Sequence, residues 1–189
     1  MAAAIDVLSP DAVRAREREL VDILVDCVEG GASVGFLPPL SPAEAARYWR
    51  SVADAIADGS RVLLTAGEPD APATGTVQLD LCTRANGLHR AEVVRLLVHR
   101  AARRQGLGRA LMEAIEAEAR RRDRTTLVLD TREGDPSEIL YRSLGWQRAG
   151  VIPHYARSAT GALDGSAFYY KLMGGAGRAP HTPLAPGAE

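Results

Sequence analysis

Residues 95–112 read RLLVHRAARRQGLGRALM, and this stretch decides the fold because it joins an apolar strand to a helix through a short basic loop. Glycines at positions 106 and 108 stand where the helix begins, and a residue without a Cβ lets a ligand approach the backbone closely. The first turn of a helix also presents unpaired N–H groups and the positive end of the helix dipole. Three arginines add formal positive charge to the segment, at positions 103, 104 and 109. The segment therefore predicts a binding site for a polyanion such as a pyrophosphate.

The spacing of the glycines narrows the class of polyanion. The run lacks Gly-x-x-x-x-Gly-Lys-Ser/Thr, which excludes a nucleotide P-loop, and Leu111 breaks the Gly-x-Gly-x-x-Gly pattern of a Rossmann dinucleotide site. Residues 103–108, RRQGLG, match instead the pattern Arg/Gln-x-x-Gly-x-Gly. The alternative interpretation of this hexapeptide is a basic, solvated loop between a strand and a helix.

Periodicity and capping residues place this segment within a chain of mixed helices and strands. Ser9-Pro10 and Ser41-Pro42 each combine a helix N-cap with a proline in the first turn, and residues 135–138, DPSE, repeat that signal. Helical spacing predicts helices over residues 10–29, 42–58, 107–122 and 136–145. β-Branched and aliphatic runs predict strands over residues 5–8, 61–66, 74–81, 91–98, 125–130, 146–152 and 167–172. The predicted order is helices, an antiparallel meander, and then alternating strands and helices, which is a single α/β domain with a mixed sheet.

Length and composition set the limits of the domain and exclude some classes of partner. We assign residues 1–173 to one globular domain, and residues 174–189, rich in Gly, Pro and Ala, to a disordered tail. The formal net charge of −1 gives no electrostatic case for binding nucleic acid or an anionic membrane. We see no signal peptide and no apolar stretch near the roughly 20 residues that span a bilayer, so we expect a cytoplasmic protein.

The two cysteines, Cys27 and Cys82, each lie in an apolar run, and we expect both to be small buried thiols. Neither has a CxxC neighbour or a metal-type spacing to histidine, so we expect no metal site.

A second motif lies downstream, where residues 140–146 read LYRSLGW and match Leu-Tyr-x-x-x-Gly-Phe/Trp. With RRQGLG and the elements around it, this motif gives most of the chain a resemblance to the GNAT superfamily of N-acetyltransferases. The resemblance implies an α/β GNAT fold, in which a mixed, mostly antiparallel central sheet of about six to seven strands is flanked by about four helices. It also implies acetyl-CoA as the acetyl donor.

Within that superfamily the sequence resembles the tabtoxin resistance protein group. The residues that carry this narrower resemblance are 35–40 (GFLPPL), 86–92 (NGLHRAE), Asp130, 134–135 (GD) and 151–156 (VIPHYA).

The resemblance to GNAT enzymes implies where the cofactor lies. The pantetheine arm runs beside the fourth strand, where the backbone of Leu96, Leu97 and Val98 contacts the arm and the acetyl group, and one N–H polarises the thioester carbonyl. The side chains of these three residues have core packing as a compatible second role. The resemblance assigns the other cofactor contacts to Arg103, Arg104, Gln105, Gly106, Leu107, Gly108, Arg109, Ser137 and Tyr141. Gly134 stands where many members carry an asparagine that touches pantetheine.

Three residues are the predicted catalysts. Tyr141 suits the role of general acid, because a phenol with a pKa near 10 protonates a departing thiolate, and the resemblance places it near the CoA sulfur. Glu92 opens the fourth strand and Asp130 closes the fifth, so both flank one cleft in this interpretation, and either is a candidate for the general base that takes the proton of the amine. The alternatives are a packing role for Tyr141, a surface charge at Glu92 and a turn residue at Asp130.

The acceptor is predicted to be a primary amine on a small molecule, with antibiotic or antimetabolite detoxification as a role. Phe36, Leu37 and Tyr155 are predicted to line its site together with Glu92 and Asp130, although the two loop residues also suit a packing lid. Two other functions stay open, a protein lysine or N-terminal acetyltransferase and a non-catalytic acetyl-CoA-binding regulatory module. The apolar loop favours a partly covered site over an open peptide groove. A homodimer through edge strands is one open alternative for the assembly.

Overall fold

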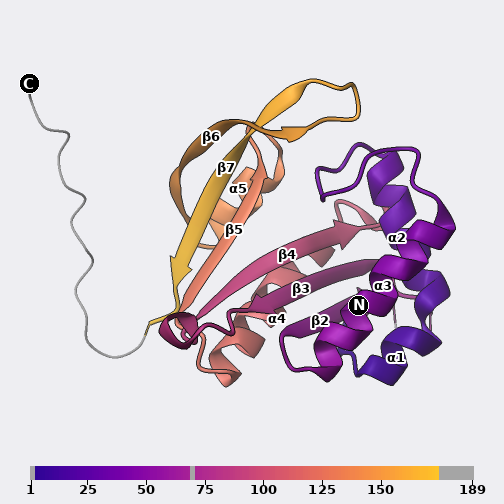
Figure 1. Ribbon diagram of the computed structural model, residues 1–189, viewed down its shortest axis with the longest axis horizontal. Helices are drawn as coiled ribbons and strands as arrows, with labels where there is room; N and C mark the ends of the chain where they lie inside the picture. Colours follow the sequence, from indigo (N-terminus) through magenta and orange to yellow (C-terminus); the bar gives the residue numbers. More distant parts are fainter. Residues whose placement is uncertain (1–2, 69–70, 175–189) are drawn as a thin grey trace, which may run out of the picture.

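Within residues 3–68 and 71–174, which a computed structural model describes, seven strands form one sheet in the order β1-β2-β3-β4-β5-β7-β6 (Figure 1). The strands are β1 (Ala4–Val7), β2 (Arg61–Gly67), β3 (Gly75–Leu81), β4 (Arg90–Val98), β5 (Thr126–Arg132), β6 (Gln147–Arg157) and β7 (Leu163–Leu172). The helices are α1 (Pro10–Ala15), α2 (Glu17–Glu29), α3 (Pro42–Ala57), α4 (Leu107–Arg121) and α5 (Ser137–Ser143). β4 pairs parallel to β5 and the other described pairs are antiparallel, which confirms a mixed, mostly antiparallel sheet.

The first predicted helix, over residues 10–29, is in fact two helices. Arg16, with φ −101° and ψ 15°, ends α1 and precedes α2. Its guanidinium donates to Glu19 Oε2 at 3.1 Å and to Thr65 Oγ1 of β2 at 3.2 Å, so this residue turns toward the sheet and interrupts the helix. The apolar spacing continues through the break, which hides it in the sequence. The described residues therefore contain five α-helices where about four were expected.

The two predicted serine caps are confirmed, and they set where the N-terminal helices begin. The Ser9 hydroxyl accepts from the Ala12 N–H at 3.2 Å, and the Ser41 hydroxyl accepts from the Glu44 N–H at 3.2 Å. Each cap satisfies a donor that the first helical turn leaves free, with a proline in the position that needs no donor.

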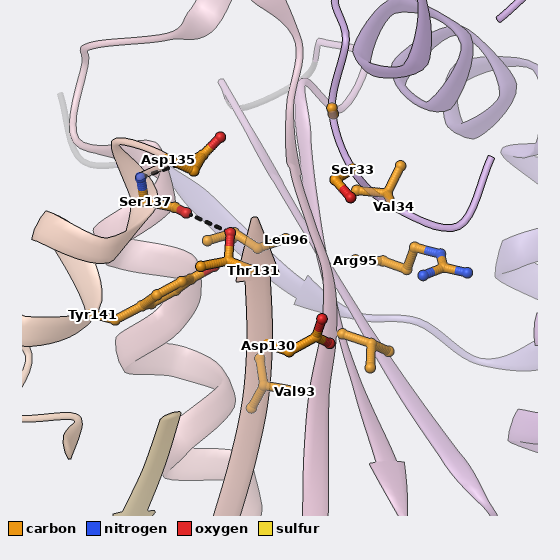
Figure 2. Close-up of a pocket in the computed structure, with 12 residues that line it drawn as sticks. Ser33, Val34, Val93, Arg95, Leu96, Asp130, Thr131, Asp135, Ser137 and Tyr141 are labelled. Carbon is orange, nitrogen blue, oxygen red and sulfur yellow. Dashed lines mark hydrogen bonds between the residues drawn. The ribbon is translucent and has the colours of Figure 1, made fainter. Parts of the chain in front are cut away.

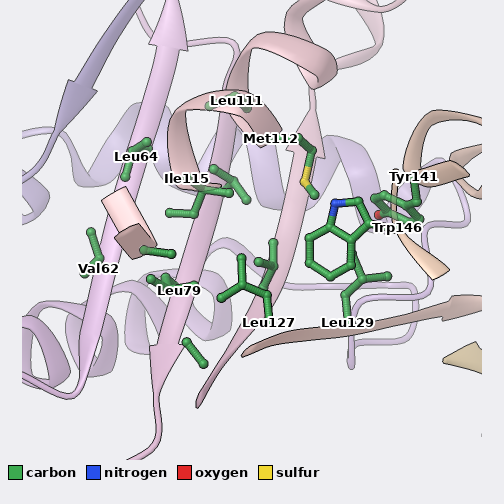
Figure 3. Close-up of a cluster of buried hydrophobic side chains, with 14 of the residues drawn as sticks. Val62, Leu64, Leu79, Leu111, Met112, Ile115, Leu127, Leu129, Tyr141 and Trp146 are labelled. Atoms are coloured by element: carbon green, nitrogen blue, oxygen red, sulfur yellow. The ribbon is translucent and has the colours of Figure 1, made fainter. Parts of the chain in front are cut away.

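Helices cover both faces of the sheet, but unequally. On one face α4 packs the side chains of Leu111, Met112 and Ile115 onto the strands, as Figure 3 shows. On the other face α3 packs against β2 and α2 packs against the carboxyl end of β4, and Trp49 of α3 is fully buried there. Val128 and Asp130 of β5 point to this second face beyond the helices and keep some exposure, because Leu127 and Leu129 take the α4 side. The second face therefore stays accessible over β5 and over the first part of β4, before Leu97.

The parallel pair β4–β5 is short. Arg90–Glu92 pair with Thr126–Val128, and beyond this point no pairing joins the two strands within the described residues. Both strands run on in the same direction, β4 to Val98 and β5 to Arg132, so they diverge toward their carboxyl ends. This divergence leaves an opening through the sheet with α4 and α5 on one side.

The β6–β7 hairpin is longer than the sequence predicts. β6 reaches Arg157 and β7 begins at Leu163, whereas the predicted strands covered residues 146–152 and 167–172. Nearly every side chain of β6 is exposed, so the strand lacks the alternation that marks a half-buried strand. Cys27 is buried as expected, but Cys82 is only partly buried, and both are free thiols.

Two predicted segments fall outside the described residues. They are residues 175–189 of the predicted tail and residues 69–70 of the turn between β2 and β3. Of the helices that the structure describes, none combines the length and the hydropathy needed to cross a membrane.

Candidate active site

The start of α4 has backbone geometry that suits an anion. β4 ends at Val98, and a 3-10 turn (Arg100–Ala102) leads to Gly106, which is the N-cap residue of α4 and has φ 82°. This left-handed conformation favours glycine. No side chain caps α4, in contrast to α1 and α3, so the N–H groups of its first turn remain available to a ligand. A 15-residue helix with a bare N-terminus after a basic loop fits a pyrophosphate.

The arginines of this loop differ in how they are held. Arg103 Nε donates to the Val98 carbonyl at 3.0 Å, and Arg109 Nη2 donates to Ser143 Oγ of α5 at 2.7 Å. Arg104 is exposed and has φ 66°. The side chain of Leu107 belongs to the core, which leaves only its backbone N–H for a ligand. The loop therefore combines one unconstrained guanidinium with two that the protein orients.

β4 contains a β-bulge next to the opening. Thr76 of β3 pairs with Leu97 and Gln78 pairs with Val94, so Arg95 and Leu96 together stand opposite one residue. Arg95 has φ 54° there, which is unusual for a residue with a long side chain. A bulge leaves backbone groups of the strand unpaired and available to a ligand. Of the three residues predicted to contact pantetheine, Leu96 lies in the bulge, whereas Leu97 is buried in the core.

The opening between β4 and β5 contains a cavity of about 170 Å³ (Figure 2). This volume suits only the reacting groups, because pockets that hold a whole drug-sized ligand measure about 300 to 1,000 Å³. Its lining residues are Ala32, Ser33 and Val34 of the loop after α2, residues 93–96 of β4, Asp130 and Thr131 of β5, and Asp135, Ser137 and Tyr141. The cavity thus joins the bulge, the end of β5 and the first turn of α5.

Tyr141 reaches this cavity from α5. Its ring is buried, with centroids 6.4 Å from Trp146 and 6.0 Å from Tyr169. Burial raises the pKa of the Tyr141 phenol well above its usual value, while a hydrogen bond from Ser137 acts in the opposite direction. The Ser137 hydroxyl is itself 2.9 Å from Thr131 Oγ1. A phenol in this environment stays protonated, so it can donate a proton but cannot act as a base.

Asp130 lies at the edge of the cavity, on the strand side that α4 does not cover. Ser166 Oγ of β7 donates to Asp130 Oδ2 at 2.5 Å, which fixes the orientation of the carboxylate. The carboxylate is exposed enough to meet a ligand that enters from this face. Figure 2 shows the Asp130 carboxylate and Tyr141 on opposite sides of strand β5.

Glu92 lies on the same side of the sheet as Asp130, one pleat earlier. Its strand neighbour is Val128 on β5, and its direct partner across β3 is Asp80. The pKa of the Glu92 carboxyl is raised, first by burial of the carboxyl among protein atoms and then by the negative charges of Asp130 and Asp80. Arg61 and Arg95 oppose this effect. A glutamate with a raised pKa suits a base that accepts a proton near neutral pH.

Phe36, Leu37 and Tyr155, which were predicted to line the acceptor site, lie in different surroundings. Phe36 packs its ring against Tyr48 of α3 at a centroid distance of 5.3 Å, and Leu37 is exposed. Tyr155 of β6 packs edge-on against Phe168 and is half exposed. None of the three lines the cavity between β4 and β5. Their role in binding the acceptor therefore remains a prediction.

Sequence reasoning missed two groups of cavity residues. Ser33 and Val34 precede the apolar loop, and nothing in their types indicates a site. Arg95 did carry a signal, since it is the one charged residue within the apolar run 93–98. Asp135 accepts from the Ser137 N–H at 2.8 Å and so acts at the start of α5, as its position before the helix suggests.

Comparisons with known proteins agree with this geometry. Protein YncA from Salmonella typhimurium, whose solved structure contains its cofactor acetyl-CoA, has a TM-score of 0.75 and 18% identity, over 96% of this chain and 99% of that one. A ribosomal-protein-alanine N-acetyltransferase from Brucella melitensis has a TM-score of 0.73 and 21% identity, over 89% and 99%. A protein described as a phosphinothricin N-acetyltransferase has a TM-score of 0.74 and 16% identity, over 92% and 100%. At these identities the three structures show a shared fold.

The family assignment comes from the sequence match. Residues 19–146, which are more than half of the chain, match the model of the acetyltransferase (GNAT) family. This segment includes the bulge in β4, the bare N-terminus of α4 and the LYRSLGW motif with Tyr141. The chain therefore belongs to the GNAT family and is an acetyltransferase that uses acetyl-CoA as its acetyl donor.

Proposed function

We propose that this enzyme acetylates the primary amine of a small molecule by direct transfer, with Glu92 as general base and Tyr141 as general acid. The observation that carries the proposal is that Asp130 and the buried, protonated phenol of Tyr141 line one cavity. Glu92 does not line this cavity, but its carboxyl, which has a raised pKa, lies near enough to feel the charge of Asp130 on the same face of the sheet. Bound acetyl-CoA supplies the thioester that the amine attacks. Glu92 takes a proton from the amine, Tyr141 donates one to the sulfur, and Asp130 keeps the pKa of Glu92 high.

The cover over the opening supports a small acceptor. Arg132, at the end of β5, donates from Nη2 to the Gly31 carbonyl at 3.0 Å and pairs with Asp164 of β7 at 3.0 Å. This contact holds the loop after α2 against the far side of the opening, and Ser33 and Val34 of that loop line the cavity. A peptide needs an extended groove with strand edges or pockets along it. The tethered loop favours a compact acceptor over a protein chain.

The comparisons name both kinds of acceptor, so the test must include both. Two structural neighbours are described as a phosphinothricin and a ribosomal-protein-alanine N-acetyltransferase, but both are below 25% identical to this chain. The resemblance to the tabtoxin resistance group supports a role in detoxifying an antibiotic or antimetabolite amine. We would measure CoA release with amino acids, polyamines, amine antibiotics, and peptides with free α-amines or lysines. Turnover confined to peptides would contradict the proposal.

The cofactor site predicts the effect of one glycine substitution. Gly106→Ala should weaken acetyl-CoA binding by about tenfold or more, because a Cβ at φ 82° strains the turn that aims the first N–H groups of α4. Gly59→Ala is the matched control: Gly59 has φ 80°, a Cβ there would also meet open space, and it lies at the end of α3. Isothermal titration calorimetry gives the two affinities and urea unfolding gives the two stabilities. Equal affinity in both variants would show that the phosphates bind elsewhere.

A further inference from the structure

Arg95 extends from the bulge toward the face of the sheet where the acceptor enters. Its guanidinium lies 5.5 Å from the ring centre of Phe36 and 5.3 Å from that of Tyr48. Figure 2 shows its side chain on the same side of the strands as Ser33 and Val34, away from Tyr141. The loop after α2 covers it closely, since a Cβ on Gly35 would stand 3.0 Å from Arg95 Nη2. The guanidinium is therefore held in one place by two rings and a glycine.

Arg95 combines a strained backbone with N–H donors that have no hydrogen-bond partner in the described part of the chain. The backbone of Arg95 adopts φ 54°, which is a strained conformation for a residue with a long side chain. Within the described residues its guanidinium forms no ion pair, and its buried Nε has no hydrogen-bond partner. Two aromatic rings stabilise a cation from its faces, but they leave the N–H donors in its plane unsatisfied. Within residues 3–68 and 71–174, no acceptor oxygen bonds to these donors.

Two other arginines near the site are paired with carboxylates. Arg61, on the same face of the sheet, bonds the carboxylate of Asp80, and Arg132 pairs with Asp164. A carboxylate accepts two parallel N–H bonds from a guanidinium, and this bidentate geometry is the strongest that arginine forms with an organic anion. Arg95 is held in a fixed orientation without one.

The charges beside Arg95 are arranged in two poles. Glu92, Asp130 and Asp80 are mutually close enough that the two aspartates raise the pKa of Glu92, and Arg95 lowers it. Arg61 is also near Glu92, but it is already paired with Asp80. A ligand in this space therefore meets carboxylates and the guanidinium of Arg95, which forms no ion pair within the described residues. A molecule with an ammonium and an anion a few bonds apart complements both poles.

We propose that Arg95 binds a carboxylate of the acceptor, so that the acceptor is an amino acid or a close relative whose amine and carboxylate are separated by a few bonds. This inference rests on the proposed function, since it concerns the molecule whose amine faces Glu92. The carboxylate accepts hydrogen bonds from the guanidinium, while the amine lies between Glu92 and the opening. Phe36 and Tyr48 hold the guanidinium in place and act as positioning residues.

The test compares acceptors that differ only in the carboxylate. Each proteinogenic amino acid is assayed beside its carboxamide and its decarboxylated amine, with saturating acetyl-CoA and kcat and KM measured separately. We expect the best amino acid to exceed its amide in kcat/KM by about 10- to 100-fold, mostly through KM, because a charged hydrogen bond is lost. In Arg95→Gln this ratio should fall close to one. Arg95→Lys should recover only part of it, because an ammonium lacks the planar fork.

Two controls separate recognition from folding. Arg47→Gln removes the same charge from an exposed position on α3, next in sequence to Tyr48, and should leave the ratio between acid and amide at its parent value. Phe36→Leu removes one of the stacked rings while keeping the cation, and should reduce the ratio without abolishing it. If Arg95→Gln does not fold, the ratio of kcat/KM between acid and amide in the parent enzyme still tests whether the acceptor carboxylate is recognised.

The results distinguish failure of carboxylate recognition by Arg95 from failure of the proposed function. Equal turnover of acids and amides by the parent, or an unchanged ratio in Arg95→Gln, would overturn the inference and leave the proposed function intact. If no amine is acetylated, the proposed function fails, and the anchor is then judged by calorimetry of the same acids and amides with the CoA-loaded protein. Equal or absent binding of both classes in that experiment would also overturn it.

Discussion

Replacing Glu92 with glutamine is expected to lower kcat/KM for the amine by about 10²- to 10⁴-fold at neutral pH, which is the usual contribution of a general base. Glutamine keeps the shape and the hydrogen-bonding capacity of the side chain but cannot take a proton. The loss should appear in kcat, and acetyl-CoA binding should persist because Glu92 is not part of the phosphate site proposed at the start of α4. Stopped assays of CoA release across a pH series measure both parameters.

The dependence of kcat/KM on pH tests whether Glu92 is the general base. The base must be ionised, so kcat/KM rises with pH through the pKa of Glu92, and burial with the charges of Asp130 and Asp80 places that midpoint above the ordinary value of about 4.3. Asp130→Asn removes one of those charges and should shift the midpoint to lower pH while the limb survives. If the limb disappears in Asp130→Asn and persists in Glu92→Gln, the base is Asp130.

Glu92→Gln should lower activity without lowering the stability of the fold. A carboxyl whose pKa is raised by folding favours the folded state when it is protonated, and this contribution is lost as the pH rises from the ordinary value through the raised one. At neutral pH the ionised Glu92 therefore opposes folding, so Glu92→Gln should keep or raise the melting temperature. A variant that is inactive because it is unfolded would show a lower one, which distinguishes the two explanations.

Local signals in the sequence were enough for most of the architecture. Each serine followed by proline marked a helix start that the structure confirms, and the aliphatic runs marked the strands of the core. The break at Arg16 escaped because it depends on Thr65, a residue 49 positions away. The exposed strand β6 escaped because a strand that buries almost nothing has no alternation to detect. In both cases a tertiary contact or a pairing partner, and not the local sequence, sets the structure.

The site was predictable where a motif carries its own geometry. RRQGLG predicted a helix start with unpaired N–H groups, and the structure places Gly106 there as the N-cap residue, without a side-chain cap. The left-handed conformation of Gly106 was seen only in the structure. The bulge at Arg95 was not predictable, because a register shift of one residue is a property of β3 and β4 together. The hydrogen bond between Ser166 and Asp130 likewise joins residues 36 positions apart. Placing Glu92 and Asp130 on one face required knowing that β4 and β5 are parallel neighbours.

Replacing Tyr141 with phenylalanine is the second change with a large expected effect, a fall in kcat of about a hundredfold or more. The ring contacts with Trp146 and Tyr169 survive the change, so the loss is confined to the hydroxyl. Because burial raises the pKa of the phenol far above neutral, the fraction of protonated Tyr141 does not vary across the working range. The ratio of parent to variant rates should therefore be constant with pH, unlike the ratio for Glu92→Gln.

Tyr170→Phe is the matched control for this experiment, since it removes a hydroxyl that bonds Gln147 at 2.7 Å on the neighbouring strand β6, outside the cavity. Rapid-quench kinetics under single-turnover conditions isolate the acetyl-transfer step from product release. If Tyr141→Phe reacts as fast as Tyr170→Phe, a solvent molecule and not the phenol protonates the sulfur. If neither the parent nor the variant turns over any amine while both bind acetyl-CoA, the chain is a regulatory binding module. Only a large loss specific to Tyr141 supports transfer in which the amine is deprotonated from one face of the sheet and the thiolate is protonated from the other.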